Sequence, residues 1–483
     1  MAHLRVLWSA VILILLLSTF AGGQTPGRLF TVTSDADSYD AIPGNGICAD
    51  SQGRCTLRSA IDESNAEPSG RDVVIFSLQY PAVIFLAGPL QINGNLSVVG
   101  PGARRLSIEI DQVNPPTIEG FPLIAASGQG SNVMVRGLTL RHGAGLEFGG
   151  NNPAGAFNVS AGVTAVLADA VLTDNYAYRG GAIHNRGTLT ITRSLFASNK
   201  ASQDGGAIQT FPGSTTRIFN STFSGNRARN GGSIHASGTL VSVNNTFALG
   251  ESTATNFILD LGFPRDIYSS KGSQVYLMNT LVVSDNTHFT HSLFGNFISL
   301  GNNFITDNRD SIGFTNGVNG DQVRNDNSLN PMIGPLADNG GQTNTHALNT
   351  GSPAINMGNS CVFLGPCPSV PGSTVRLFYD QRAGSLRGGI IDAVDIGAFE
   401  VQNGSSSGST LGSIPGIPSP RTFYNNSQLI LINVETGERI YRSIGPGGPI
   451  RTPNLPPGVV FVQELANKRS AFKPPPVVIA FPD

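Results

Sequence analysis

The chain has 483 residues, of which 59 are glycine, and only 13% of its residues are charged. Its formal net charge is -2, and the balance stays mildly acidic without Arg5. These values exclude a nucleic-acid binder with a basic face and indicate a turn-rich, exported all-β protein.

Residues 1–23 have the order of a secretory signal peptide. Arg5 precedes the short apolar run Val11–Leu17, and small residues follow in Ala21–Gly23. This order predicts cleavage between Ala21 and Gln24, with the export machinery as a partner. An uncleaved membrane anchor is the rival interpretation, but an anchor needs about 20 apolar residues. No later stretch is long and apolar enough to cross a bilayer, so we expect no transmembrane helix in the mature chain.

Residues 24–70 contain Cys48 and a run from Cys55 to Ala66. This segment resembles the bacterial N-terminal module named for its Cys-Ser-Leu-Arg-Glu-Ala signature. Thr56 stands in place of the serine and Ser59 in place of the glutamate. The resemblance implies a bacterial exported protein.

Residues 57–65 predict a short amphipathic helix, because apolar residues recur there at helical spacing. Such a helix would cover the open first coil of a solenoid, which otherwise exposes apolar core and unpaired strand edges. The opposite face carries Arg58, Asp62 and Glu63. We expect these three on a solvated surface, and a catalytic role is the alternative. The predicted buried face consists of Leu57, Ala60, Ile61 and Ser64.

Residues 71–310 read as a succession of short strands and tight turns. Runs such as Val73–Phe76 and Leu106–Ile110 are apolar or β-branched, and glycines separate them. We expect Gly143–Gly155 and Gly250–Lys271 to be loops that leave the coils.

Between residues 172 and 247 a short motif recurs. Its bulky apolar positions are separated by 24, 27 and 24 residues, which suits one coil of a β-solenoid. An asparagine and then a glycine pair follow each of the first apolar positions. The apolar positions are Leu172, Phe196, Phe223 and Phe247, the asparagines are Asn175, Asn199 and Asn226, and the glycines are Gly180, Gly181, Gly205, Gly206, Gly231 and Gly232. We expect Leu281 and Phe304 to continue the apolar series.

The repeat predicts a right-handed parallel β-helix, a solenoid of the pectate-lyase type. Coils stack about 4.8 Å apart, so the apolar position of each coil would form an internal ladder. The asparagines and glycine pairs would form the turns, because both tolerate backbone conformations that other residues avoid. A β-sandwich, which also has short strands and frequent turns, is the alternative, but the fixed order of the motifs favours the solenoid.

The pairing of Phe-x-x-Asn with Gly-Gly-Ala-Ile, as in Phe196–Asn199 and Gly205–Ile208, resembles the repeats of the bacterial polymorphic outer membrane proteins. The resemblance covers residues 172 to 247. It implies a surface or secreted protein, and it implies no activity.

A calcium-dependent or loop-based polysaccharide lyase or hydrolase is the alternative function, since the same fold carries such enzymes. A lyase of that kind needs acidic residues stacked on one outer face to hold calcium. The positions equivalent to Asp174 are Ser198 and Gly225, so we expect no such stack and no metal or cofactor. Catalysis from irregular loops would escape this test.

Two histidines of the repeat are candidate metal ligands. His184 and His235 each follow a repeat isoleucine, and Gln209 takes the position between them. Two coils would separate the imidazoles by about 9 to 10 Å, which is a poor metal site. We expect His184 on the outer face, where its removal would have little effect on stability.

Residues 311–402 resemble the choice-of-anchor Q domain, which occurs in bacterial surface proteins beside varied C-terminal anchoring segments. Asn356 stands where the family pattern has aspartate, and Ala383 where it has glycine. The matching stretches are Asn330–Leu348, Gly351–Asn356, Asp380–Arg382 and Asp395–Glu400.

Polar residues of this region are candidates for a functional cluster, namely His346, Asp380, Arg382, Asp395 and Glu400. Acid-base catalysis would need them to converge in a cleft. An aspartate and arginine beside glycine and proline turns more often form a structural clamp, and we expect that role.

Residues 403–420 are rich in serine, glycine and proline and predict a flexible linker. Residues 421–483 predict a small β domain. The order of its strands resembles the type A sorting domain of type IX secretion substrates, which implies a sorting or attachment unit. An accessory β domain without that role is the alternative, because Pro474–Pro476 interrupts the last strand.

The four cysteines form two close pairs, Cys48 with Cys55 and Cys361 with Cys367. In an oxidising compartment each pair can close a small loop, so we expect two local disulfides. Free thiols and a zinc site are the alternatives, and neither spacing is typical of structural zinc.

The sequence favours a non-catalytic secreted or cell-surface protein for display, adhesion or ligand binding. Glycans or other surface ligands are the expected partners, and nucleic acid is not. We expect a monomer that is secreted or held at the bacterial outer membrane.

Overall fold

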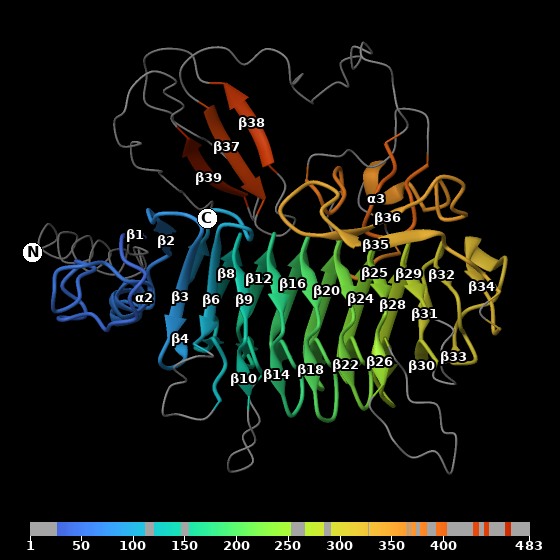
Figure 1. Cartoon of the computed structure of the whole chain (residues 1–483), viewed down its shortest axis with the longest axis horizontal. Helices are drawn as coiled ribbons and strands as arrows, with labels where there is room; N and C mark the ends of the chain where they lie inside the picture. The colour runs from blue at the N-terminus through green and yellow to red at the C-terminus, as the bar shows by residue number, and fades with distance from the viewer. Residues whose placement is uncertain are drawn as a thin grey trace, which may run out of the picture.

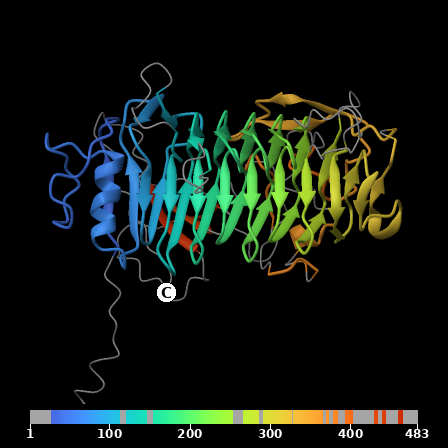
Figure 2. The same ribbon diagram turned by 90° about the horizontal axis from the view of Figure 1, so that it is seen from below.

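In the computed structural model the described residues are 27–111, 120–145, 154–252, 266–284, 291–326, 328–364, 367, 369–372, 377–383, 393–402, 428–433, 439–443 and 459–464. They contain a right-handed parallel β-helix, a rod of stacked coils (Figures 1 and 2). The predicted fold class is confirmed. The expected signal peptide, residues 1–23, lies outside the described residues.

Two parallel sheets run the length of the rod, and each has 10 strands. In spatial order sheet A consists of β1 (Leu29–Val32), β2 (Asp72–Phe76), β5 (Leu96–Val99), β8 (Asn132–Arg136), β12 (Thr164–Ala168), β16 (Thr188–Thr192), β20 (Thr215–Phe219), β24 (Thr239–Val243), β28 (Gln274–Met278) and β31 (Ile298–Ser299). Sheet B consists of β3 (Ala82–Leu86), β6 (Leu106–Ile110), β9 (Thr139–Arg141), β13 (Val171–Thr173), β17 (Leu195–Ala197), β21 (Thr222–Ser224), β25 (Thr246–Ala248), β29 (Leu281–Val283), β32 (Phe304–Ile305) and β34 (Gln322–Val323).

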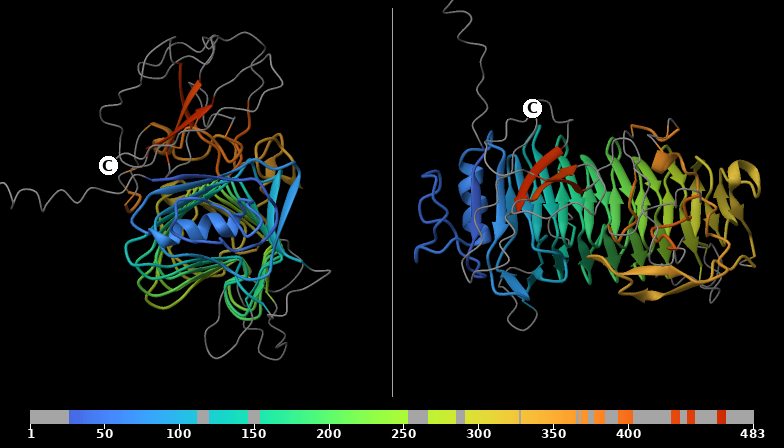
Figure 3. Two further views of the ribbon diagram at one scale, coloured as in Figure 1. Left: turned by 90° about the vertical axis from the view of Figure 1, so that its left-hand side faces the viewer. Right: turned by 90° about the horizontal axis from the view of Figure 1, so that it is seen from above.

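A 9-stranded and a 5-stranded parallel sheet complete the coils. Sheet C consists of β4 (Leu90–Ile92), β7 (Ile124–Ala126), β11 (Phe157–Val159), β15 (Ile183–Asn185), β19 (Ile208–Thr210), β23 (Ile234–Ala236), β27 (Ile267–Ser269), β30 (Leu293–Asn296) and β33 (Asp310–Ile312). Sheet D consists of β10 (Ala144–Gly145), β14 (Tyr176–Ala177), β18 (Lys200–Ala201), β22 (Arg227–Ala228) and β26 (Glu251–Ser252). The end view in Figure 3 shows how the sheets enclose the core.

The coils differ from the expected boundaries at several places. The parallel strands run from Leu29 to Val323, because β1 joins sheet A ahead of β2 and β34 extends sheet B. Both expected loops begin with strands of sheet D, β10 and β26, and the second ends with β27 of sheet C. The stretches 146–153 and 253–265 lie outside the described residues.

The inward positions of sheet B form one continuous apolar ladder whose members are all buried. The phenylalanine rings stack directly, with ring centroids 4.6 Å apart from Phe196 to Phe223 and again from Phe223 to Phe247. This distance matches the spacing of about 4.8 Å between hydrogen-bonded strands. In register the ladder contains Ile84, Ile108, Leu140, Leu172, Phe196, Phe223, Phe247, Val282 and Ile305.

The ladder departs from the expected series after Phe247. The structure pairs Val282, and not Leu281, with Phe247. Because side chains alternate between the faces of a strand, this shift by one residue turns Leu281 and Phe304 outward. Both remain buried there, since residues that follow the solenoid in the chain pack on them. The expectation that Leu281 and Phe304 belong to the internal ladder is wrong.

A second ladder consists of the buried side-chain amides of Asn175, Asn199 and Asn226. The Asn175 Nδ2 donates to Asn199 Oδ1 at 2.9 Å, and the Asn199 Nδ2 donates to Asn226 Oδ1 at 3.0 Å. The backbone N–H groups of Asn175 and Asn199 donate to the same oxygens. Each amide also donates to a carbonyl of the preceding coil, those of Leu140, Leu172 and Phe196. The asparagines therefore bind neighbouring turns together in addition to shaping each turn.

The glycine pairs are required where the chain passes from sheet D into sheet C. Gly180, Gly205 and Gly231 have φ values of 54°, 66° and 64°, in the left-handed region that favours glycine. A Cβ atom on Gly181 would lie 2.1 Å from the carbonyl oxygen of Gly206. The second glycine of the pair therefore allows successive coils to approach each other.

Helix α2 (Leu57–Ala66) closes the first end of the rod, where it packs against β1, β2 and β4. Thr56 begins the helix with a capping box, in which its side chain accepts from the Ser59 N–H and the Ser59 side chain accepts from the Thr56 N–H. Leu57, Ala60 and Ile61 are buried on the face toward the first coil. The helix thereby covers the apolar core that the first coil would expose.

The polar face of α2 is not solvated as expected. Arg58 and Glu63 are both buried, because the segment before the helix folds over them. Arg58 donates to the Asp37 carboxylate at 2.7 Å. Glu63 accepts from the backbone N–H of Gly44 at 2.6 Å and pairs with Arg28 at 3.1 Å. These charged groups hold the N-terminal loop on the helix, a structural role that helical periodicity alone does not reveal.

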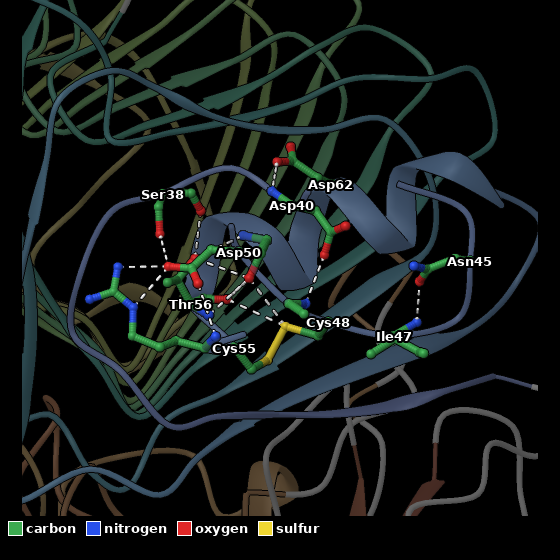
Figure 4. Close-up of a disulfide and its surroundings, with 12 residues drawn as sticks. Ser38, Asp40, Asn45, Ile47, Cys48, Asp50, Cys55, Thr56 and Asp62 are labelled. Carbon is green, nitrogen blue, oxygen red and sulfur yellow. Dashed lines mark hydrogen bonds and ion pairs between the residues drawn. A yellow bond between two sulfur atoms is a disulfide. The ribbon is translucent and has the colours of Figure 1, made fainter. Parts of the chain in front are cut away.

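Both predicted disulfides are present, Cys48–Cys55 and Cys361–Cys367. The first lies beside the start of α2 (Figure 4). In its loop, the Asp50 carboxylate accepts from the Ser38 Oγ at 2.7 Å and from the Arg54 guanidinium at 2.7 Å. The disulfide and the carboxylate together fix a loop that has little core of its own.

The described part of residues 328–402, which we call the strap, folds back along the outside of the rod (Figure 1). The strap contains the antiparallel strands β35 (Ile333–Ala337) and β36 (Thr345–Leu348) and the helix α3 (Cys361–Leu364), and it follows the 3₁₀ helix η1 (Val318–Gly320). It covers outward apolar residues of sheets A and B. The strap residues Val362, Cys367, Val370 and Leu377 pack with Phe219, Val243 and Met278, and the strap residues Leu348, Ala354 and Ile396 pack with Leu281 and Phe304.

The described part of residues 421–483 forms a 3-stranded antiparallel sheet. Its central strand β37 (Gln428–Asn433) pairs with β38 (Arg439–Ser443) on one side and with β39 (Val459–Glu464) on the other. The expected linker, residues 403–420, and the interrupted last strand at Pro474–Pro476 lie outside the described residues.

The Phe223→Ala variant should lose about 3 to 5 kcal/mol of unfolding free energy, because it leaves a cavity between two stacked rings. The exposed turn variant Lys271→Ala is the matched control and should change stability by less than about 0.5 kcal/mol. Urea titration followed by circular dichroism measures both. Equal effects of the two substitutions would contradict the ladder.

Candidate functional site

Predicted polar residues of the strap form a clamp. Asp380 is fully buried and accepts from the backbone N–H of Arg382 at 2.9 Å and from its Nε at 2.7 Å. The same carboxylate accepts from the backbone N–H of Glu400 at 3.0 Å. The Arg382 guanidinium donates to the Glu400 carbonyl and lies 3.8 Å from the ring centroid of Phe399. One buried ion pair thus joins the segment around residue 380 to the last residues of the strap.

Asp395 and Glu400 extend the clamp through backbone contacts. The Glu400 Oε2 accepts from the Asp395 N–H at 3.0 Å. The Asp395 carboxylate accepts from the N–H groups of Asn356 at 2.8 Å and Val401 at 2.6 Å. Both side chains are buried. These carboxylates satisfy backbone donors of the turns they join, which is the geometry of a structural clamp.

His346, the remaining candidate, binds the rod directly. Its Nδ1 lies 2.8 Å from the carbonyl oxygen of Gly334, and its Nε2 lies 3.0 Å from the Ser224 Oγ in β21. Burial lowers the pKa of His346. In the neutral ring Nδ1–H donates to the carbonyl, and Nε2 accepts from the hydroxyl. His346 therefore attaches β36 to sheet B.

Turn asparagines hold the strap to the rod, a role that the sequence analysis missed. They lie between sheets A and B with φ values of 48°, 53°, 47° and 56°. Each donates its side-chain amide to a strap carbonyl, at 2.7, 3.2, 3.1 and 2.8 Å in chain order. The pairs are Asn220 with Tyr379, Asn244 with Asp395, Asn279 with Asn359, and Asn302 with Met357. The available signal was an asparagine three positions before each ladder residue from Phe223 onward.

Outward threonines of sheet B also bind the strap. The Thr222 Oγ1 donates to the Gln381 Oε1 at 2.6 Å. The backbone N–H of Ala398 donates to the Thr246 Oγ1 at 3.0 Å. At the far tip of the strap, Asp338 forms an ion pair with Arg104. The strap therefore touches coils along much of the rod.

His184 lies on the outer face of its coil, as expected, but the reason for expecting a small effect of its removal does not hold, because the side chain is not open to solvent. Its side chain is buried on the outer face of sheet C and packs edge-on against Phe211, with ring centroids 5.2 Å apart. Its Nε2 lies 2.6 Å from the Arg179 carbonyl oxygen. The turn at Gly180 covers the ring so closely that a Cβ there would lie 2.4 Å from the His184 Cδ2. Burial lowers the pKa of His184 to about 4.

The second histidine of this row packs differently. His235 is in register with Gln209 on one side and with Tyr268 on the other. Its ring stacks on Tyr268 at a centroid distance of 4.8 Å, and Tyr268 stacks on Phe294 at 5.0 Å. The row is therefore an aromatic stack whose ring faces cover one another. Among the described residues, no three His, Cys, Asp or Glu side chains gather as a metal site.

Sheet D presents an exposed polar face. Its inward positions, Ala177, Ala201 and Ala228, are fully buried. The outward positions one residue earlier lie in register along the rod axis and are exposed. They are Tyr176, Lys200, Arg227 and Glu251. Figure 1 shows this sheet along the lower side of the rod and the strap along the upper side.

Comparison with known families adds one finding. Residues 220–237 match the family model described as the Chlamydia polymorphic membrane protein repeat. This stretch begins at Asn220 and contains β21, β22, the glycine pair and β23. The match suggests a bacterial outer-membrane or surface protein. No curated protein and no solved structure matches the chain.

Within the described ranges, no helix has the length and apolar character needed to cross a membrane.

The Arg382→Ala variant should release the last segment of the strap, because the buried Asp380 carboxylate loses its ion-pair partner. Removing one partner of a buried ion pair costs about 3 to 5 kcal/mol. Hydrogen exchange should show faster exchange of the Glu400 and Val401 amides while β13, β17 and β21 stay protected. Lys271→Ala is the control, and unchanged protection in Arg382→Ala would contradict the clamp.

The buried His184 should make stability depend on pH. The pKa of His184 is about 4 in the folded chain against its ordinary value of 6.5, so the unfolded chain binds the proton first as the pH falls. Stability is then full above pH 6.5 and falls by about 3 kcal/mol between 6.5 and 4. The His184→Gln variant should be less stable than the wild type at neutral pH. Its unfolding free energy should change less between pH 6.5 and pH 4. Identical pH slopes for the two proteins, measured by urea titration, would contradict the assignment.

Proposed function

We propose that this protein is a non-catalytic bacterial surface protein whose β-helix displays strand faces and loops for adhesion or ligand binding. One observation carries the proposal: residues 220–237 match a repeat of polymorphic membrane proteins. The matched stretch supplies the ladder residue Phe223, the amide of Asn226 and the glycine pair that the fold repeats. The resemblance therefore concerns the elements that build the rod.

The roles of the candidate polar residues support a display function. Asp380 and Arg382 form a buried ion pair, and His346 joins the strap to Ser224. Asp395 and Glu400 satisfy backbone N–H groups. Each group therefore has a structural task within the strap or between the strap and the rod.

The finer organisation belongs to the same proposal. Residues 1–23 act as a secretory signal, and residues 24–70 are a Cys-Ser-Leu-Arg-Glu-Ala-type module that caps the rod formed from 71–310. The helix capping box at Thr56 and the disulfide Cys48–Cys55 support this role. Residues 311–402 are a choice-of-anchor Q-like closing region, 403–420 a linker, and 421–483 a sorting or attachment unit.

The end of the strap supports attachment from the side of the rod. The backbone N–H of Gly397 donates to the Asn279 carbonyl at 2.9 Å, and that of Ala398 donates to Thr246. Residue 402 follows directly, so the chain leaves the strap beside the coils of β25 and β29 and not at an end of the rod. A tail anchored at the surface would hold the rod by its flank and leave its far side accessible.

Truncation after Gln402 tests the attachment role of the tail. The contacts of the solenoid and strap that are described above involve residues up to 402, so the truncated protein should keep the thermal transition of the full chain. We expect it to disappear from the cell surface and to be found in the periplasm or medium, as fractionation and surface immunolabelling would measure. Full surface retention of the truncated protein would contradict an anchoring tail.

A polysaccharide-degradation screen on the full chain tests the non-catalytic part of the proposal. We expect unchanged polysaccharides and intact adhesion of cells that display the protein. Release of unsaturated oligosaccharides would contradict the display function and favour a lyase. Loss of such an activity in the Arg382→Ala variant would not identify Arg382 as catalytic, because this substitution also disturbs the strap.

A further inference from the structure

We infer that the outer face of sheet D binds an acidic polysaccharide chain lying along the rod axis, an inference that rests on the proposed display function and names its ligand. The face is built by the outward positions of β14, β18, β22 and β26. Strands of neighbouring coils lie about 4.8 Å apart. An extended polymer along the axis therefore meets a new side chain from each successive coil.

Charge complementarity favours an anionic ligand. Residues 176–179, 200–204, 227–230 and 251–252 contain four basic side chains against two acidic ones, a local net charge of +2, whereas the whole chain has -2. Potential of one sign concentrated on a surface attracts ligands of opposite charge. The basic residues are Arg179, Lys200, Arg227 and Arg229, and the acidic residues are Asp204 and Glu251.

Lys200 is the centre of this face. Its ammonium lies 5.9 Å from the ring centroid of Tyr176. In the part of the chain that the structure describes, no carboxylate lies within ion-pair distance of it. An incoming carboxylate can therefore bind Lys200 without displacing a partner.

Arg227 is held by a pair that a ligand can exchange. Its Nε lies 3.2 Å from the Glu251 Oε2, and the two side chains are 50% and 53% exposed. Exposed pairs of this kind contribute little stability. A guanidinium binds a carboxylate through two parallel N–H groups, so Arg227 can pass from Glu251 to a ligand carboxylate.

Hydroxyl groups beside the cations point to a sugar polymer and not to nucleic acid. The Tyr176 hydroxyl lies 2.7 Å from the Ser202 Oγ, and Tyr176 is 37% exposed. Such groups exchange hydrogen bonds with sugar hydroxyls, and the phenol ring offers an apolar contact. A nucleic-acid surface needs a longer basic stripe, whereas this row ends at the acidic Glu251.

Binding of a fluorescent oligogalacturonate to the full-length protein, measured by anisotropy, tests this inference. The wild type should bind it, and should bind neither a neutral maltooligosaccharide nor a single-stranded oligonucleotide of equal length. Lys200→Gln/Arg227→Gln should weaken binding at least tenfold. The control Lys271→Gln/Arg324→Gln, which removes the same charge from other exposed positions, should stay within twofold of wild type.

The Glu251→Gln variant should bind more tightly than the wild type, a result that misfolding of the variant could not produce. It removes a repelling carboxylate and releases Arg227, so it should tighten oligogalacturonate binding severalfold. Weaker or equal binding by Glu251→Gln, equal loss in the control double variant, or equal affinity for the oligonucleotide would overturn the inference. If displaying cells adhere while the wild type binds no oligogalacturonate, the inference fails and the display function stands. If the wild-type protein never reaches the surface, the display function itself fails.

Discussion

The hydrogen bonds between asparagine side chains in successive coils are the interaction on which the rest of the rod depends. Asn175 and Asn199 each bind the next coil through both the side-chain amide and the backbone N–H, which donate to the side-chain oxygens of Asn199 and Asn226. An unsatisfied buried amide costs about 1 to 3 kcal/mol, so the coils that carry these asparagines must keep their register. That register places Phe196 and Phe223 face to face. The polar ladder specifies the alignment, and the apolar ladder contributes to the buried core.

The strap docks on residues that the turns between sheets A and B already require. The turn between sheets A and B needs left-handed backbone, which asparagine tolerates. At Asn220, Asn244, Asn279 and Asn302 the same residues offer amides to the strap. Outward apolar residues such as Met278 are then stable, because the strap covers them. The opposite side, at sheet D, keeps an exposed charged face.

The short period of the motif was enough to predict the fold and the inward ladder residues from Leu172 to Phe247, and the close spacing of the cysteines was enough to predict the two disulfides. The periodicity of the sequence did not predict the burial of outward side chains where a second segment of the chain covers them. Arg58, Glu63 and His184 occupy outward positions and were expected to be exposed, yet loops bury them. The contact between Asn244 and Asp395 joins residues 151 positions apart, and no local pattern contains that information. Covering by the strap also explains why Leu281 was wrongly assigned to the ladder in place of Val282. Both faces of β29 are covered, so both residues are buried and apolar.

Hydrogen exchange at the turn amides tests the central claim most directly, because turn N–H groups exchange quickly unless a specific acceptor protects them. Mass spectrometry of the native protein would follow the Asn175 and Asn199 N–H groups, which donate to Asn199 and Asn226. The account predicts that they exchange as slowly as the strand amides of β13, β17 and β21, through unfolding of the coil as a unit. Exchange at the rate of the exposed turn around Lys271 would contradict a register held by asparagine side chains.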